Sequence, residues 1–166
     1  MDCIREFFKY NSDARKRYLD TFEKIPWENL EKDMCASFGS LKGIFLHVLN
    51  AYRYWFEYGV RDKMAEYKSL DFEMYKSVAD LRRAEKEVGI MVAGFLEGIK
   101  QSDYRKVNTI HTRSGVKEWT TEELLLHMIE EELQHRGELN CLLWQLCYDA
   151  PILSFHTWYK ARGSAT

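Results

Sequence analysis

Four long stretches of this chain repeat apolar residues at three- and four-residue spacing, the period of an amphipathic α-helix. Its 166 residues include only two prolines, Pro26 and Pro151, and both lie outside those stretches. Because proline disrupts the interior of a helix, its scarcity leaves room for long helices. The pattern predicts an all-α protein, an antiparallel four-helix bundle, with helices at about residues 2–23, 40–58, 73–99 and 121–148.

The segment between the third and fourth predicted helices has no helical period. We expect residues 100–119 to form a long connection before the last core helix, with a short hairpin around Ser114 and Gly115. Thr120 and Glu123 have the spacing of a capping box, which marks a helix start. The chain shows no linker or internal repeat, so residues 1–160 are expected to form one helical bundle domain and residues 161–166 a flexible tail.

Composition excludes several classes of protein. The chain has 24 Lys and Arg against 26 Asp and Glu, so it lacks the basic excess with which nucleic-acid-binding proteins neutralise phosphates. Charges in the first turns argue against a signal peptide, and no apolar run has membrane-spanning length. The four cysteines form no metal-binding or redox pair, which is typical of reduced thiols. We therefore expect a cytoplasmic protein with no nucleic-acid or membrane partner.

The apolar face of the fourth predicted helix also carries titratable residues. At ~100° per residue, Glu131 lies in the middle of the apolar stripe, His135 is about 40° away and His127 lies at the edge. In the second predicted helix, His47 shares a face with apolar residues. This arrangement predicts that His47, Glu131 and His135 point into the protein.

A shared metal ion would explain these inward-facing groups. A buried, unpaired carboxylate is costly, whereas one cation can be bound by a carboxylate and two imidazoles together. Side chains at i and i+4 of one helix can converge with a third from a facing helix. His47, Glu131 and His135 would leave coordination positions open, as catalytic sites do. From spacing alone, a salt bridge from Glu131 to an arginine, or solvated helix faces, are equally open explanations.

At these residues the sequence resembles the DinB/YfiT-like family of metal-dependent enzymes. GSLKGIFLHVLNAYRYWF, residues 39–56, resembles the family's second helix with its histidine ligand. TTEELLLHMIEEELQHRGELNCLLWQL, residues 120–146, resembles its last core helix, and FFKYNSDARKRYL, residues 7–19, its first. The resemblance spans nearly the whole chain and is sharpest at His135-Arg136-Gly137, together with the spacing back to His47.

The resemblance implies a four-helix bundle, often dimeric, with a divalent metal such as nickel or zinc on three histidines. His47 matches the first ligand and His135 the last. Position 131, which matches the middle ligand, holds Glu131 instead of histidine. His127 is an alternative middle ligand, although its place at the edge of the stripe favours Glu131. We expect zinc or nickel, with iron or manganese as alternatives suited to a site containing a carboxylate.

The resemblance also implies a reaction class, because some members are thiol-dependent transferases or isomerases and others are related to hydrolases. The expected function is a metal-dependent transferase or hydrolase in which the metal activates water or a low-molecular-weight thiol towards a small-molecule substrate. Glu85, Glu132 and Glu138 are candidates for a catalytic base. A solvated surface position is the simpler interpretation of each.

The fourth predicted helix has a second apolar side, formed by Leu126, Leu133, Cys141 and Trp144. A helix that is apolar on two sides is buried on two sides, which in so small a domain favours a homodimer. Two further functions stay open at this point: a non-catalytic dimeric bundle that has lost its metal chemistry, and a non-haem iron protein that handles oxygen. Whether the chain is an enzyme is therefore left open by its sequence.

Overall fold

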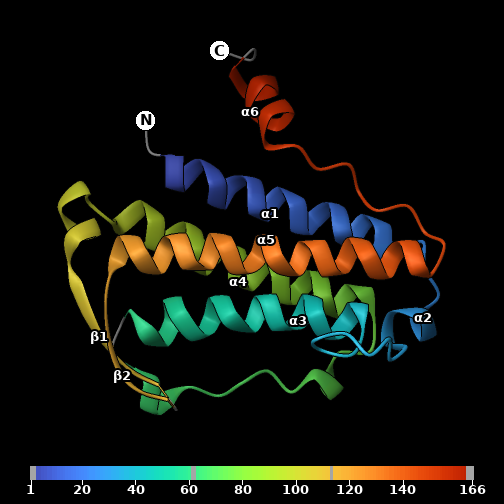
Figure 1. Ribbon diagram of the computed structural model, residues 1–166, viewed down its shortest axis with the longest axis horizontal. Coiled ribbons are helices and arrows are strands. Elements are labelled where there is room, and N and C mark those ends of the chain that lie inside the picture. The colour runs from blue at the N-terminus through green and yellow to red at the C-terminus, as the bar shows by residue number, and fades with distance from the viewer. Residues whose placement is uncertain (1–2, 61–62, 113, 164–166) are drawn as a thin grey trace.

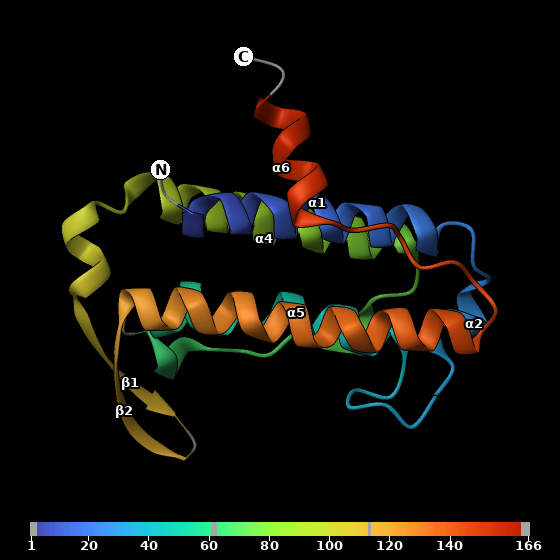
Figure 2. The ribbon, with the colours of Figure 1, turned by 45° about the horizontal axis from the view of Figure 1, so that its top comes forward.

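The computed structural model describes residues 3–60, 63–112 and 114–163, and they form a mostly helical protein. Four long helices lie side by side in two layers (Figures 1 and 2). They are α1 (Cys3–Phe22), α3 (Leu41–Tyr52), α4 (Val78–Gly98) and α5 (Thr121–Gln145). One layer contains α1 and α4, and the other contains α3 and α5.

The directions of these helices differ in part from the antiparallel arrangement expected from the sequence. Helices are antiparallel within each layer, but α3 and α4, in different layers, run the same way (Figure 1). Contacts at both ends show this: Lys42 Nζ donates to the carbonyl of Tyr75 at their beginnings, and Phe56 packs on Phe95 at their ends. The chain between α3 and α4 therefore has to return along the bundle, which a short loop cannot do.

The helices begin where polar caps permit. Ser40 accepts a hydrogen bond from the Gly43 amide at the start of α3, and Ser77 accepts one from the Asp80 amide at the start of α4. The third predicted helix consequently begins at Val78 instead of residue 73. The predicted capping box of Thr120 and Glu123 is present at the start of α5.

The ends of two helices are irregular. Helix α3 continues as a π-helical turn, η1 (Arg53–Gly59), so the second predicted helix has nearly its full expected length. Helix α5 ends at Gln145, before the predicted end at residue 148, because Cys147 takes a left-handed conformation with φ 62°. The amide of Tyr148 then donates to the carbonyl of Leu143, which satisfies a free carbonyl of the last turn.

The long connection before α5 is present but ordered. It contains the 3₁₀ helix η4 (Gln101–Arg105) and an antiparallel hairpin of β1 (Val107–Thr112) and β2 (Gly115–Thr120). The hairpin brackets the predicted turn at Ser114 and Gly115. Because of this small sheet, the protein is mostly helical and not strictly all-α. Other short helices are α2 (Trp27–Glu31), η2 (Met64–Glu66) and η3 (Phe72–Met74).

A final helix, α6 (Phe155–Gly163), was not predicted from the sequence. It projects from the four-helix body and packs on α1 (Figure 2). The Phe155 ring stacks on Phe7 at 4.1 Å, and Trp158 Nε1 donates to Asp13 Oδ2 at 2.7 Å. The expected flexible tail at 161–166 overlaps this helix as far as Gly163, and residues 164–166 lie outside the described part of the chain.

The core lies between the two layers and is rich in aromatic rings. Its largest fully buried side chains come from all four long helices and η1, and include Phe22, Phe45, Tyr52, Phe56 and Leu81. Burial of so many large apolar groups supplies the main stabilisation of the fold. Among the described residues, none of the helices combines the length and apolar character needed to cross a membrane.

Candidate metal centre

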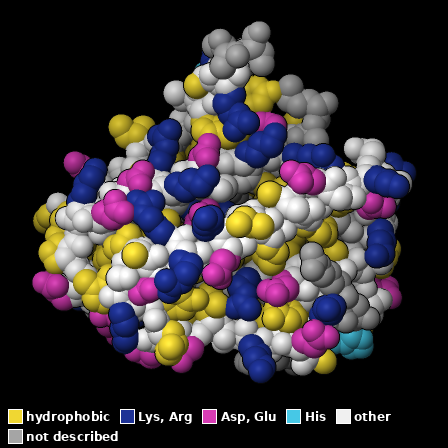
Figure 3. Space-filling model, turned by 180° about the vertical axis from the view of Figure 1, so that it is seen from behind, with side chains coloured by type: hydrophobic (Ala, Val, Ile, Leu, Met, Phe, Trp, Pro, Cys, Tyr) yellow, Lys and Arg dark blue, Asp and Glu magenta, His cyan; other side chains and the backbone are white. Residues whose placement is uncertain are grey.

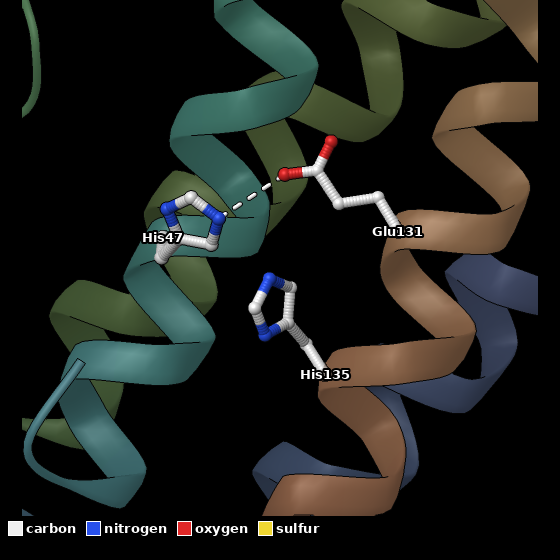
Figure 4. Close-up of side chains that lie close together, drawn as sticks. All are labelled: His47, Glu131 and His135. Carbon is white, nitrogen blue, oxygen red and sulfur yellow. Dashed lines mark hydrogen bonds and ion pairs between the residues drawn. The ribbon is translucent and has the colours of Figure 1, made fainter. Parts of the chain in front are cut away.

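The antiparallel pair α3 and α5 brings His47, Glu131 and His135 together, as Figure 4 shows. One ligand atom from each residue lies within 4.8 Å of the others. His47 Nε2 is 3.1 Å from Glu131 Oε1, and the centroids of the two imidazole rings are 4.7 Å apart. The four-residue step from Glu131 to His135 puts both on the side of α5 that faces α3.

The cluster lies at the edge of the core, where small molecules can reach it. The His47 and Glu131 side chains are 21% and 18% exposed, whereas His135 is buried. Burial by itself would raise the pKa of the Glu131 carboxyl. The hydrogen bond from His47 and the charges of His47, His127 and His135 outweigh it and hold that pKa below its usual value. Glu131 is thus an anionic ligand at neutral pH.

The residues present fit a divalent metal ion. Two imidazoles and a carboxylate are ligands that zinc, iron and related ions accept, and three protein ligands leave positions for water or substrate. Atoms bound ~2.1 Å from one ion are at most ~4.2 Å apart, so the observed spread needs only a small closing movement. The ring nitrogen of His135 that faces His47 and Glu131 is Nε2, since Nδ1 is 3.2 Å from Glu138 Oε2 on the other side (Figure 4).

His127 lies beside this cluster and outside it. Its side chain is 36% exposed, and its Nε2 is 3.5 Å from Glu131 Oε2. The rings of Trp55 and Trp119 approach it edge-on, with centroids at 5.6 Å and 5.1 Å. The structure therefore groups Glu131, and not His127, with the two other histidines, in agreement with the peripheral position of His127 on the helical wheel.

The loop before α3 adds two residues that sequence spacing did not reveal. The Phe38 ring stacks on His47 with centroids 3.6 Å apart, and it meets His135 edge-on at 5.5 Å. Ser37 Oγ donates to Glu138 Oε2 at 2.5 Å. Neither residue belongs to a helical pattern, so periodicity gave no signal for them. Their contribution depends on how the loop folds back over α3 and α5.

The expectation that Glu132 is a solvated residue is wrong. Its side chain is 3% exposed, and its Oε2 accepts hydrogen bonds from Arg15 Nη1 at 2.7 Å and the Tyr52 hydroxyl at 2.5 Å. Arg136 Nη2 lies 3.6 Å from Oε1 of the same carboxylate. With two guanidinium groups against it, Glu132 is held as a buried ion and is not placed to exchange protons with a substrate.

The same correction applies to Glu85, which is buried rather than exposed. Its Oε1 is 3.5 Å from Arg15 Nε and accepts a hydrogen bond from Ser12 Oγ at 3.3 Å. Burial works against the charge on Arg15, but the charges of Glu132, Tyr52 and Glu85 raise its pKa above the ordinary value. Glu85 and Glu132 thus form a buried ion network with Arg15, between the layers.

An open cleft of about 860 Å³ lies at the hairpin end of the α3–α5 layer. Trp55 belongs both to its wall and to the surroundings of His127, which in turn contacts Glu131. Its other lining residues are aromatic, basic or neutral polar groups, among them Tyr54, Tyr67, His111 and Lys117. The cleft is therefore separated from the candidate metal centre by the His127 side chain and its two tryptophan neighbours.

Together, a mostly helical two-layer fold and inward-facing His, Glu and His side chains are typical of helical metal-binding proteins. The sequence matches the DinB family over residues 1–162, so the chain belongs to the DinB family, and the resemblance noted from its sequence is confirmed. No curated protein matches the chain.

Among solved structures, the chain is similar to a DinB-like protein from Bacillus cereus, with a TM-score of 0.71. The match covers 93% of this chain and 97% of that protein at 16% sequence identity. At this identity the likeness shows a common fold and carries no information on activity.

Proposed function

We propose that this protein is a divalent-metal-dependent enzyme of the DinB type, a thiol-dependent transferase or a hydrolase, built on a four-helix bundle. The metal is held by His47, Glu131 and His135. The convergence of these three side chains from two helices, within 4.8 Å of one another, carries the proposal. The family assignment supports it, because the matched region includes all three residues.

The chain's own residues have distinct parts in this proposal. When bound, a divalent metal lowers the pKa of a coordinated water or thiol and so supplies a nucleophile at neutral pH. Glu131 offsets part of the positive charge, and His47 and His135 hold the site between α3 and α5. His127 is 3.5 Å from Glu131 and borders the cleft side, where it can orient a substrate group or accept a proton.

The cleft next to His127 is the proposed substrate-binding region. Tyr54, Trp55 and Tyr67 offer flat apolar surfaces, and Lys117 and His111 add positive or polar character, while no acidic residue lines it. These features suit a small molecule that combines an apolar part with an anionic or polar group. A low-molecular-weight thiol with a carboxylate fits this description.

The ligand set favours a second candidate, a non-haem iron protein. Two histidines and one carboxylate with open positions are the ligands of many iron enzymes that react with oxygen. The identity of the bound metal separates the two: zinc or nickel supports thiol or hydrolytic chemistry, and iron with air-dependent turnover supports oxygen chemistry.

The test is to purify the protein untagged, without added metal, and count bound metals by inductively coupled plasma mass spectrometry. We expect about one metal per chain, lost in His135→Ala and in Glu131→Ala. His127→Ala is the matched control, because it removes a neighbouring imidazole outside the cluster. Metal lost in His127→Ala but retained in Glu131→Ala would move the middle ligand to His127. Absence of metal, even after addition of zinc, nickel or iron, would leave a non-catalytic bundle.

A further inference from the structure

The geometry points to a positioning role for Glu138 and the loop residue Ser37: together they fix the ring of His135 so that its Nε2 is a free lone pair facing the metal centre. We infer this role on the basis of the proposed metal-dependent function. It also assigns to Glu138 a task other than that of the catalytic base considered from the sequence.

The first step concerns the proton on His135. Its Nδ1 is 3.2 Å from Glu138 Oε2. A carboxylate only accepts hydrogen bonds, so Nδ1 has to carry the hydrogen. In a neutral imidazole the other nitrogen, Nε2, is then unprotonated. This is the nitrogen turned towards His47 and Glu131 in Figure 4. Glu138 therefore prepares His135 as a metal ligand.

The second step concerns the orientation of Glu138, which is 30% exposed and would otherwise be free to turn. Ser37 Oγ donates to the same oxygen, Oε2, at 2.5 Å. The loop carrying Ser37 also places Phe38 against His47 and His135. The loop thus holds Glu138 and the two histidine rings at once.

His47 has a different arrangement. Its Nε2 faces Glu131 Oε1 at 3.1 Å, so in this structure Nε2 carries the hydrogen and donates to the carboxylate. Binding of a cation has to replace that hydrogen. His135 needs no such change, because Glu138 already holds the hydrogen on the far side of its ring. The two histidines of the site are thus prepared to different degrees.

The chain contains a matched control for Glu138. His127 and Glu130 have the same three-residue spacing on the same helix, with His127 Nδ1 3.8 Å from Glu130 Oε2. Glu130 is 67% exposed, and His127 lies outside the cluster. Glu130→Ala therefore removes an equivalent charge from α5 without touching the ring of His135.

The experiment combines two measurements on the full chain. Nitrogen-15 NMR of histidine-labelled, metal-free protein reports the ring tautomers, and competitive titration reports zinc affinity. We expect His135 to carry its hydrogen on Nδ1 in the unaltered chain and in Glu130→Ala. Glu138→Ala should lose that preference and bind zinc about 10- to 100-fold more weakly. Glu138→Gln keeps an accepting oxygen and should restore both, and Ser37→Ala should fall between.

The outcomes separate this inference from the proposed function. If the unaltered chain binds zinc but His135 carries its hydrogen on Nε2, or if Glu138→Ala binds zinc as tightly, the positioning role is overturned and the metal site stands. If Glu138→Gln is as weak as Glu138→Ala while both fold, a hydrogen-bond acceptor is not what matters, and the inference also fails. If the unaltered chain binds no zinc, the proposed function fails and the inference with it.

Discussion

Glu131 and Glu132 are neighbours in sequence, yet their carboxylates lie in different surroundings. One residue along a helix turns the side chain by ~100°, which is enough to move it from one neighbouring helix to another. Glu131 consequently meets His47 of α3 at the edge of the core, and Glu132 meets Arg15 of α1 inside it. Proximity in sequence to a candidate ligand therefore did not make Glu132 part of the metal centre.

Removing Glu132 is expected to destabilise the fold strongly. In Glu132→Ala the guanidinium groups of Arg15 and Arg136 stay buried without their carboxylate, and such a loss typically costs about 3–5 kcal/mol. Urea unfolding followed by circular dichroism measures the change. The control is Glu130→Ala, which is exposed and should change the free energy of unfolding by less than about 0.5 kcal/mol. Equal stability of the two variants would contradict a structural role for Glu132.

Tyr52 makes stability sensitive to alkaline pH. Burial raises the pKa of its hydroxyl, and the charge of Glu132 and the hydrogen bond to it raise that pKa further, against the opposing effect of Arg15. In the unfolded chain a tyrosine loses its proton near pH ~10. Above that pH the unfolded state binds fewer protons than the folded state, so stability is full below pH ~10 and falls as the pH rises.

The corresponding variant is Tyr52→Phe, which has no proton to lose. We expect its free energy of unfolding to fall less steeply between about pH 9 and pH 11 than that of the unaltered chain. At pH ~7 the variant should be less stable by about 1 kcal/mol, because a hydrogen bond to Glu132 is missing. Urea unfolding across this pH range measures both effects. Parallel pH profiles would show that the Tyr52 hydroxyl does not contribute to the alkaline loss.

At the scale of elements, the loop before α3 depends on a glycine in the first turn of that helix. A Cβ added at Gly43 would lie 2.0 Å from the carbonyl oxygen of Phe38, a backbone atom that cannot turn aside. Any other residue at this position has to displace the loop. Since the loop places Phe38 on His47 and Ser37 on Glu138, the geometry of the metal centre is tied to the size of residue 43.

Gly43→Ala is therefore expected to destabilise the protein by about 1–3 kcal/mol, the usual cost of overpacking, and to weaken zinc binding. Its control is Gly94→Ala in α4, where an added Cβ has nothing within 4 Å. There the better helix propensity of alanine should stabilise by about 0.5–1 kcal/mol. Thermal unfolding and zinc titration of both variants measure these effects. An unchanged zinc affinity in Gly43→Ala would separate the loop from the metal centre.

At the scale of the whole molecule, the outer side of α5 differs from the opposite face. Leu126, Leu133 and Trp144 of α5 are 50%, 43% and 63% exposed. On the opposite face, basic and acidic side chains alternate between small apolar spots (Figure 3). One example is Arg82 of α4, which pairs with Asp20 and Glu23 of α1. A continuous apolar strip on one helix suits contact with another protein surface.

We propose that this strip of α5 forms the interface of a homodimer, as the two apolar sides of the helix indicate. Size-exclusion chromatography with light scattering should give twice the 19.8 kDa chain mass. Leu133→Glu puts a charge in the strip and should produce a monomer. Ile90→Glu is the control, since Ile90 of α4 is also exposed, at 65%, but lies outside the strip. A monomeric unaltered chain, or dissociation by Ile90→Glu alone, would contradict the proposal.

Properties of single helices were determined by the sequence itself, because they depend on residues a few positions apart. The helical period located the four long helices, the Thr120–Glu123 spacing located the start of α5, and the wheel set Glu131 and His135 on an inward face with His127 at its edge. The match of His47 to a distant helix came from the family resemblance, which carries the packing of related chains.

Only the tertiary structure decided what lies opposite each face. The parallel run of α3 and α4 depends on a connection without helical periodicity, and the burial of Glu85 and Glu132 depends on Arg15, which lies 70 or more positions away in the chain. Ser37 and Phe38 reach the metal centre because Gly43 lets their loop lie close to α3. These contacts join segments whose spacing in sequence has no fixed relation to their distance in space, so no local pattern can encode them.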